Sequence, residues 1–287
     1  MSLALSSRDA FAQALDGARD VALCAYTLAP GGAVARALER AATRGARVCV
    51  RLESRPAFGR DAPAGDTAGV AADLRAHGVT VSTSAPDDPP AHLKAAVVDG
   101  RAFLDDRNWA TSGHETIVSD DDPADVAAVR EAIAGQPAVT SGLALEKRAA
   151  LAREVEAIAS APGDRIDVAS ESFGPSLVSA ALAARARAGT HVRLEVTARA
   201  LKEDLSGRER AVLGRLAAAG VEVRAVAGDE KFCLAGDRAW LGSANATWSS
   251  GAMSDWGVTT REPAIEADLA ATFARAWATG TPITSAT

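Results

Sequence analysis

The sequence predicts an α/β protein made of two similar halves, each a mostly parallel mixed sheet flanked by helices. Two observations predict this fold class. Apolar strand-like segments alternate with helical segments along all 287 residues, which is typical of sheets covered by right-handed crossover helices. The same order of segments, with similar short sequences at their ends, also occurs twice. A repeat of this length indicates a duplicated domain rather than a solenoid.

The first half is expected to alternate strands and helices and then to form a hairpin. The strands are expected at Val21–Leu28, Arg47–Leu52 and Val79–Ser82, and the helices at Ala33–Thr43 and Ala68–Ala76. The hairpin pairs Lys94–Val98 with Arg101–Leu104 around Asp99-Gly100, a dipeptide that favours a tight turn. Pro123 is expected to begin a further helix, because proline is well tolerated at the first helical position.

The second half repeats this plan. Its strands are expected at Arg165–Ala169, Val192–Val196 and Val221–Val226, and its helices at Ser176–Arg187, Leu205–Ala218 and Ala264–Trp277. An extra helix, Leu145–Ile158, is expected after the Gly- and Pro-containing stretch 135–142. We therefore expect the two halves to be residues 1–140 and 141–287. The irregular stretch 54–66 reads as a long loop near the mouth of a site, since loops of such length are often functional.

Composition places the chain among ordinary globular proteins. Hydrophobic residues make up 48% and charged residues 24% of the chain. No apolar stretch approaches the ~18 residues that suggest a membrane span. The first residues lack a basic segment followed by a long apolar one, so no signal peptide is visible and a cytoplasmic location is expected. The net charge of −6 disfavours a protein that coats nucleic acid.

The three cysteines do not have metal-ligand spacing. Cys24, Cys49 and Cys233 all lie in apolar strand-like segments. An odd number of such residues predicts buried free thiols rather than a disulfide or a metal site. The run Asp120-Asp121-Asp122 before Pro123 is better explained as a charged helix entry than as part of a metal site.

Two segments that contain the hairpins align without a gap. The first runs from His92 to Asn108 and the second from Asp229 to Asn245. The aligned pairs are His92 with Asp229, Lys94 with Lys231, Asp99 with Gly236, Asp106 with Ser243, and Asn108 with Asn245. The repeat therefore carries its chemistry-bearing residues at fixed positions, and one copy has lost its histidine.

These residues resemble the phospholipase D superfamily, whose hallmark is His-x-Lys, four residues, Asp, a short hairpin and Gly-Ser-x-Asn, usually present twice. His92-x-Lys94-x4-Asp99 matches the opening of this motif, and Gly242-Ser243-Ala244-Asn245 matches its close. The resemblance covers nearly the whole chain. It implies two phospholipase D-like halves related by a pseudo-twofold, with one motif in each half.

The resemblance also implies cleavage or transfer at a phosphodiester without a metal or other cofactor. A neutral imidazole is a nucleophile at neutral pH, and Lys and Asn donate hydrogen bonds where negative charge accumulates. Carried over position by position, His92 is the candidate nucleophile that forms a phosphohistidine. The candidate phosphate ligands are Lys94, Lys231, Asn108, Ser243 and Asn245. Glu115 and Asp255 stand where the family often has an acidic residue that orients a site histidine. Asp99 is expected to belong to the scaffold.

Two departures weaken the match. Asp229 replaces the second histidine, so the usual general acid is missing unless a carboxylic acid serves instead, and general acid catalysis contributes about 10²- to 10⁴-fold. Asp106 stands where the family has serine, and an anion beside phosphate is repulsive unless Arg107 or a lysine neutralises it.

Three functions remain open from the sequence. The first is an active phosphodiesterase or phosphatidyl-type transferase that uses His92 and a carboxylate, with Asp229 as catalytic candidate. The second is a degenerate member that binds a phosphorylated ligand or partner without turnover. The third is a nuclease of the same superfamily. A lipid headgroup and a nucleic acid are both possible phosphodiester substrates. The six motif residues His92, Lys94, Asn108, Lys231, Ser243 and Asn245 are expected to converge on one phosphate, and no oligomer is required to build the site.

Overall fold

The computed structural model describes residues 3–56, 67–85, 87–88, 90–109, 116–136, 138–198, 207–247 and 253–283. The chain divides into two compact units. The first is Met1–Lys147 together with Gly251–Trp256, and the second is Arg148–Ser250 together with Gly257–Thr287. The halves 1–140 and 141–287 stay a prediction as domain limits. Of the expected loop 54–66, residues 57–66 lie outside the described part of the chain.

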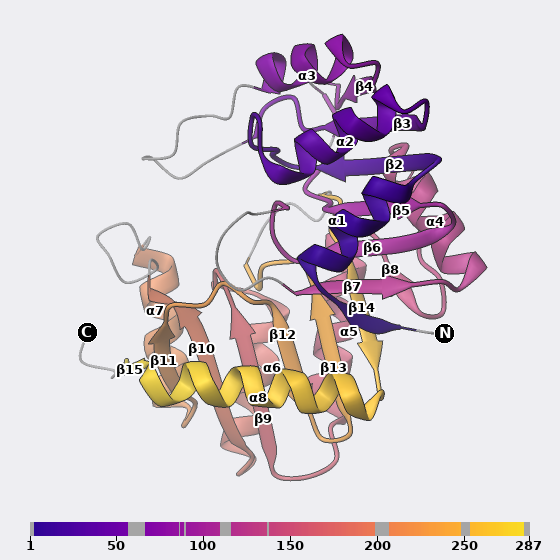
Figure 1. Ribbon diagram of the computed structural model, residues 1–287. Coiled ribbons are helices and arrows are strands. Elements are labelled where there is room, and N and C mark those ends of the chain that lie inside the picture. Colours follow the sequence, from indigo (N-terminus) through magenta and orange to yellow (C-terminus); the bar gives the residue numbers. More distant parts are fainter. Residues whose placement is uncertain are drawn as a thin grey trace. The chain divides into compact units, whose positions relative to one another are not determined.

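The first unit holds a sheet in the order β1-β7-β6-β5-β2-β3-β4, coloured indigo to magenta in Figure 1. Its strands are β1 (Ala4–Ser6), β2 (Asp20–Ala25), β3 (Arg47–Leu52), β4 (Thr80–Thr83), β5 (Ala95–Val98), β6 (Arg101–Asp105) and β7 (Ile117–Asp120). Its helices are α1 (Arg8–Gly17), α2 (Ala33–Thr43), α3 (Thr67–Ala76) and α4 (Pro123–Ile133), and a short strand β8 (Leu143–Ala144) follows them.

The second unit holds a sheet in the order β15-β11-β10-β9-β12-β13-β14. Its strands are β9 (Arg165–Ser170), β10 (His191–Thr197), β11 (Glu222–Val226), β12 (Phe232–Ala235), β13 (Arg238–Gly242), β14 (Gly257–Thr260) and β15 (Thr281–Pro282). Its helices are α5 (Lys147–Ser160), α6 (Leu177–Arg187), α7 (Gly207–Ala218) and α8 (Pro263–Thr279). The expected start of α7 at Leu205 lies outside the described residues.

The two sheets repeat one topology. β2, β3 and β4 pair in parallel, and β9, β10 and β11 do the same in the second unit. The motif hairpins β5–β6 and β12–β13 then pair antiparallel to β2 and β9 respectively. The sheets are mixed, as expected, but the expectation of mostly parallel sheets is wrong. The parallel part stops at three strands, because each hairpin and the strand after it add antiparallel neighbours.

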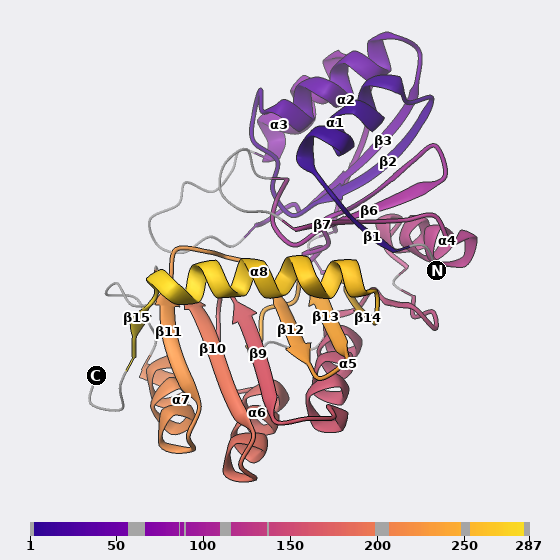
Figure 2. The ribbon, with the colours of Figure 1, turned by 60° about the horizontal axis from the view of Figure 1, so that its bottom comes forward.

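Helices cover both faces of the second sheet. In Figures 1 and 2, α8 crosses one face of β9–β13, whereas α5, α6 and α7 lie on the opposite face. Local sequence explains where helices begin. Ser176 and Ser179 form a capping box at the start of α6. The Asp122 carboxylate accepts hydrogen bonds from the Ala124 and Asp125 amides, which confirms the charged entry expected for α4.

The core of the first unit is a layer of apolar side chains between the sheet and its helices. α2 contributes Val34, Leu38 and Ala41, which recur at helical spacing and are buried. β2 and β3 contribute Leu23 and Val50 from the facing sheet. A fully buried side chain of this kind stabilises the fold by about 1.5–3 kcal/mol.

The expectation of three buried thiols is wrong for one of them. Cys24 and Cys233 are buried, but Cys49 is only partly buried. The burial of β3 alternates along the strand, and Cys49 falls on its less covered face. Desolvation raises the pKa of the Cys24 thiol to about 12, so this thiol is unreactive at neutral pH.

Several elements were not anticipated from the sequence. These are α1 with β1 at the start of the chain, and the strands β7 and β14 that follow each motif. The Ser7 hydroxyl accepts a hydrogen bond from the Ala10 amide and so caps α1. No helix in the described part of the chain is long and apolar enough to cross a membrane.

Candidate active site

The two hairpins hold their lysines in equivalent positions. Lys94 directly precedes β5, and its carbonyl oxygen accepts the Asp105 amide at 2.9 Å. Lys231 directly precedes β12, and its carbonyl oxygen accepts the Gly242 amide at 3.2 Å. Both lysines are buried, at 2% and 3% exposed, although burying an ammonium group is costly without partners. Each lysine therefore needs polar neighbours, and the two units supply different ones.

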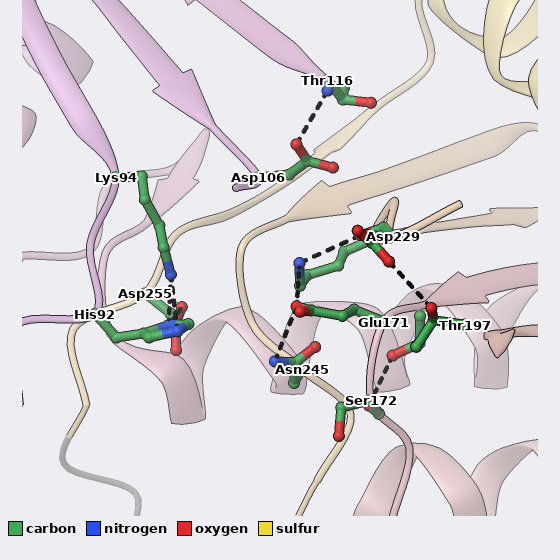
Figure 3. A network of polar contacts seen from close by, with 12 residues as sticks. His92, Lys94, Asp106, Thr116, Glu171, Ser172, Thr197, Asp229, Asn245 and Asp255 are labelled. Carbon is green, nitrogen blue, oxygen red and sulfur yellow. Dashed lines mark hydrogen bonds and ion pairs between the residues drawn. The ribbon is translucent and has the colours of Figure 1, made fainter. Parts of the chain in front are cut away.

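In the first unit, Lys94 lies against the candidate nucleophile (Figure 3). Its Nζ is 2.9 Å from Nδ1 and 2.8 Å from Nε2 of His92. The Tyr26 ring packs edge-on against the imidazole, with 4.7 Å between the ring centroids. The Lys94 amine also lies 5.4 Å from the centroid of the Tyr26 ring. The phenol ring thus confines both side chains without adding a charge.

Asp255 orients His92. Its Oδ1 lies 2.7 Å from His92 Nδ1, and the carboxylate is completely buried. Burial alone would raise the pKa of Asp255, but the charge and hydrogen bond of His92, together with Lys94 and Lys147, lower it to about 2. An ionised carboxylate only accepts hydrogen bonds, so Nδ1 carries the hydrogen, and in the neutral form of the imidazole Nε2 keeps its lone pair. The expected acidic partner of the site histidine is present.

Lys147 is a second buried cation near this carboxylate. It is 5% exposed, and its backbone amide donates to the Met253 carbonyl oxygen at 3.0 Å. Desolvation lowers the pKa of Lys147, and the negative charge of Asp255 opposes this shift. No sequence pattern predicts a role for this residue, because it lies in neither copy of the motif.

The loop that carries Asn108 is held from both sides. The Asp105 carboxylate accepts the Trp109 amide at 2.6 Å, and the Trp109 indole donates to the Cys24 carbonyl oxygen at 3.1 Å. Trp109 has a φ of 52°, which is uncommon for a large side chain and requires such support. The side-chain oxygen of Asn108 is buried and has no hydrogen-bond partner among the described residues.

Asp106 has a structural contact in this unit. Its Oδ1 accepts the Thr116 amide at 3.0 Å, and its own amide donates to the Thr116 carbonyl oxygen at 3.2 Å. The carboxylate is 1% exposed. Asp106 therefore ties the loop after β6 to the residue before β7. Glu115, the other acidic candidate, lies outside the described residues.

In the second unit, Lys231 lies against the carboxylate of Glu171. Its Nζ is 2.8 Å from Oε2 of Glu171, and the Asn245 side-chain amide points to the same oxygen at 3.5 Å. Glu171 directly follows β9, and its side chain is 45% exposed. The side-chain oxygen of Asn245 is buried and has no hydrogen-bond partner in the part of the chain that is described.

Asp229 is buried beside this group. It is 8% exposed, and the Thr197 hydroxyl donates to its carboxylate at 3.1 Å. Its backbone oxygen lies 3.4 Å from Lys231 Nζ. Ser243, at the end of β13, is completely buried. Lys231, Asp229 and Asn245 thus gather in the second unit, as His92, Lys94 and Asp255 gather in the first.

Asp99 has the scaffold contact expected for it. Its carboxylate accepts the amides of Arg19 and Asp20, at 3.0 Å and 2.8 Å, and so fixes the turn of the first hairpin to the start of β2. One group with metal-ligand spacing exists among the described residues, namely Glu39, Asp73 and His77 on or next to α2 and α3. None of these three residues belongs to the motif.

Comparisons with known proteins identify the fold of the chain. No protein-family model and no curated protein sequence matches the chain. Among solved structures, the polyphosphate kinase from Porphyromonas gingivalis matches with a TM-score of 0.74 and 16% identity, over 99% of this chain and 48% of the kinase. The phosphatidylserine synthase from Haemophilus influenzae Rd KW20 matches with a TM-score of 0.71 and 8% identity, over 98% of this chain and 87% of the synthase.

The chain has the phospholipase D fold. It spans about half the length of the polyphosphate kinase. A phospholipase D family member, Nuc from Salmonella typhimurium, also matches, with a TM-score of 0.42 and 18% identity, over 47% of this chain and 90% of Nuc. The two structures that match nearly the whole of this chain are named as a kinase and a synthase.

Within this phospholipase D fold, two residues near the motif lysines were not predicted from the sequence, and both follow central strands. Tyr26 follows β2 and Glu171 follows β9, and strand pairing gives the two residues the same register in the repeat. Extending the repeat alignment to these strands would have paired them. The convergence of both motif copies on one phosphate stays a prediction.

Proposed function

We propose that the chain is a phosphodiesterase or phosphatidyl-type transferase that acts through a phosphohistidine at His92 without a metal. The observation that carries this proposal is the hydrogen bond of 2.7 Å from His92 to the buried Asp255. Because this carboxylate has a pKa of about 2, it stays ionised at neutral pH and orients the imidazole through Nδ1. Neutral His92 then attacks through Nε2 when the Lys94 amine, 2.8 Å from that nitrogen, turns to the phosphate.

The proposed reaction has two displacements at phosphorus. His92 Nε2 attacks, a phosphorus–nitrogen bond forms, and the bond from phosphorus to the leaving oxygen breaks. Water or an acceptor alcohol then attacks phosphorus, its proton passes to the carboxylate that served as the acid in the first step, and the imidazole leaves with its electron pair. Lys94 and Asn108 on one motif copy and Lys231, Ser243 and Asn245 on the other offset the charge on the phosphate oxygens. Asp229 is the candidate that protonates the leaving oxygen, because it stands in the place of the missing histidine.

A binding function is the second candidate, and one contact favours it. The Glu171 carboxylate lies 2.8 Å from Lys231, so the ammonium group of the second motif copy already has an anionic partner. In this alternative, the chain holds a phosphorylated ligand or partner and His92 performs no turnover.

The proposal is tested with a bis-aryl phosphate. Its aryl alcohol is a good leaving group that needs little protonation, so the absence of a second histidine matters least for this substrate. We expect release of the alcohol that persists in EDTA and is lost in His92→Ala. His191→Ala is the matched control, because His191 is an exposed histidine that pairs with Glu222 on the surface.

The intermediate gives a second readout. With an inefficient acid–base partner, breakdown of the phosphohistidine is slow, so mass spectrometry of the quenched protein should find phosphate on His92. The absence of both alcohol release and phosphorylated His92, in a protein that still binds phosphate, would favour the binding function. Assays with a phospholipid and with single-stranded DNA then separate a lipid enzyme from a nuclease.

A further inference from the structure

Glu171 holds the two phosphate-binding side chains of the second motif copy. A single carboxylate oxygen, Oε2, lies 2.8 Å from Lys231 Nζ and 3.5 Å from Asn245 Nδ2. A phosphate oxygen bound by these donors would take the same place, because carboxylate and phosphate oxygens accept hydrogen bonds in similar geometry. A ligand that uses Lys231 and Asn245 must therefore displace the Glu171 side chain.

Exposure allows this displacement. Lys231 is 3% exposed and is fixed by the hairpin, whereas the Glu171 side chain is 45% exposed and follows the end of β9. Because the Glu171 carboxylate is partly in contact with solvent, screening weakens its ion pair with Lys231, and a bound phosphate can compete with it. The carboxylate remains near the ligand after it leaves the lysine, and its charge then repels the ligand.

Lys231 contacts a carboxylate directly, whereas Lys94 contacts His92, which in turn contacts the Asp255 carboxylate. Lys231 has the carboxylates of Glu171 and Asp229 in its unit, and the Asp229 carboxylate is bound by Thr197. In the first unit, the register position of Glu171 is occupied by Tyr26, a neutral ring beside Lys94. Coulomb repulsion between Glu171 and a bound anion grows with the charge of that anion.

We propose that Glu171 is a specificity-determining residue that competes with ligand oxygens for Lys231 and Asn245 and selects singly charged phosphodiesters over doubly charged phosphomonoesters. This inference rests on the proposed function for its site, and it assigns the second motif copy a role in ligand choice. A diester carries one negative charge, whereas a monoester carries nearly two above pH 7. Repulsion from Glu171 therefore weakens monoester binding more than diester binding.

The test measures equilibrium binding of dimethyl phosphate and methyl phosphate at pH 8 by isothermal titration calorimetry. Dimethyl phosphate has a poor leaving group, so binding is measured without turnover. In Glu171→Gln we expect dimethyl phosphate to bind about tenfold more tightly and methyl phosphate to gain several times more than that. The selectivity for the diester should fall accordingly.

Two further variants separate a local effect from a general one. Glu209→Gln removes the same charge from a carboxylate of the same unit that accepts from Ser172, and its affinities should stay within about twofold of the wild type. In a Lys231→Met background, Glu171→Gln should give little gain, because the lysine that both anions share is absent. If Lys231→Met does not fold, as judged by a thermal melt, Lys231→Gln serves in its place, because it also removes the ammonium charge.

Unchanged affinities in Glu171→Gln would overturn the proposal, as would an equal gain in Glu209→Gln or an undiminished gain without Lys231. These results are distinct from failure of the proposed function. Loss of aryl alcohol release in every assay, together with a tighter diester complex in Glu171→Gln, would reject turnover and leave the selectivity role intact. Release of the aryl alcohol that depends on His92, with no effect of Glu171→Gln on binding, would support turnover and reject the selectivity role.

Discussion

The two units have the same strand topology but differ in the side chains that surround the buried lysine of the motif. In each, a hairpin follows three parallel strands and presents a buried lysine. In the first unit, that lysine lies against His92 and the neutral Tyr26. In the second, it lies against Glu171, with Asp229 in the place of the histidine. The register of the hairpin thus preserves the positions of the side chains, while single substitutions decide whether those positions suit a nucleophile.

The turns of the two hairpins differ for a packing reason. Asp99 has a φ of 46°, which aspartate tolerates, and its carboxylate accepts two backbone amides. Gly236 takes this position in the second unit with a φ of 64°. A Cβ there would lie 2.4 Å from the Pro162 carbonyl oxygen, so only glycine fits. The loss of the motif aspartate in this copy follows from close packing, not from the chemistry of phosphate.

The helices that precede the central strands also differ. α1 buries the apolar residues Phe11 and Leu15. α5 buries Glu154, which is 2% exposed and has an oxygen without a hydrogen-bond partner among the described residues. Desolvation raises the pKa of Glu154 to about 8, so the side chain is a neutral acid at pH 7. The core of the second unit therefore contains a buried acid that loses its proton near pH 8.

The largest effect is expected from removing the charge that orients the nucleophile. Asp255→Asn should lower the rate of aryl alcohol release by about 10²- to 10⁴-fold, because His92 loses its ionised partner and its preferred tautomer. Asp229→Asn should change the rate by less than about tenfold, because the aryl leaving group needs little protonation. Steady-state kinetics of the two variants measure the difference. Equal losses of rate in the two variants would mean that both units contribute alike to catalysis, which would contradict the assignment of the nucleophile to the first unit alone.

A smaller effect is expected on stability at alkaline pH. Glu154 has a folded pKa of about 8 against 4.5 in the unfolded chain. The folded state binds the proton more tightly, so stability falls as pH rises from 4.5 to about 8, by at most about 5 kcal/mol. Glu154→Gln should remove the contribution of this side chain, seen as a higher melting temperature than the wild type at pH 9, while Glu195, whose pKa burial also raises to about 8, still contributes. Glu156→Gln, an exposed position on the same helix, should leave the profile unchanged.

The smallest effect concerns the turns. Gly236→Ala should destabilise the protein by about 3 kcal/mol, because the positive φ and the contact with Pro162 both oppose a side chain. Gly100→Ala is the matched control. Gly100 also has a positive φ, of 84°, but a Cβ there would meet nothing within 4 Å. Its cost should be about 1 kcal/mol from the backbone alone. Urea unfolding measures both, and equal costs would show that Pro162 yields to the added methyl group.

The sequence by itself determined the alternation of elements and the positions of the motif. Helix α2 and strand β3 fall on the expected residues. The spacing of hydrophobic residues and the glycines at the ends of an element are local properties of the sequence, so they predict its type and limits. The gap-free repeat also placed both lysines directly before the first strand of each hairpin. Elements without such signals were missed, among them β7 and β14, which are short and exist because they pair with the hairpins.

Only the tertiary structure decided which side chains surround each lysine. The contact of His92 with Asp255 joins residues 163 positions apart, and that of Lys231 with Glu171 joins the hairpin to the end of a parallel strand. The burial of Lys147 and Glu154, and hence the direction of their pKa shifts, also depends on packing. Local sequence encodes the period and ends of an element. Desolvation and charge pairing arise only when distant elements enclose a group, so they appear in the fold and not in the pattern.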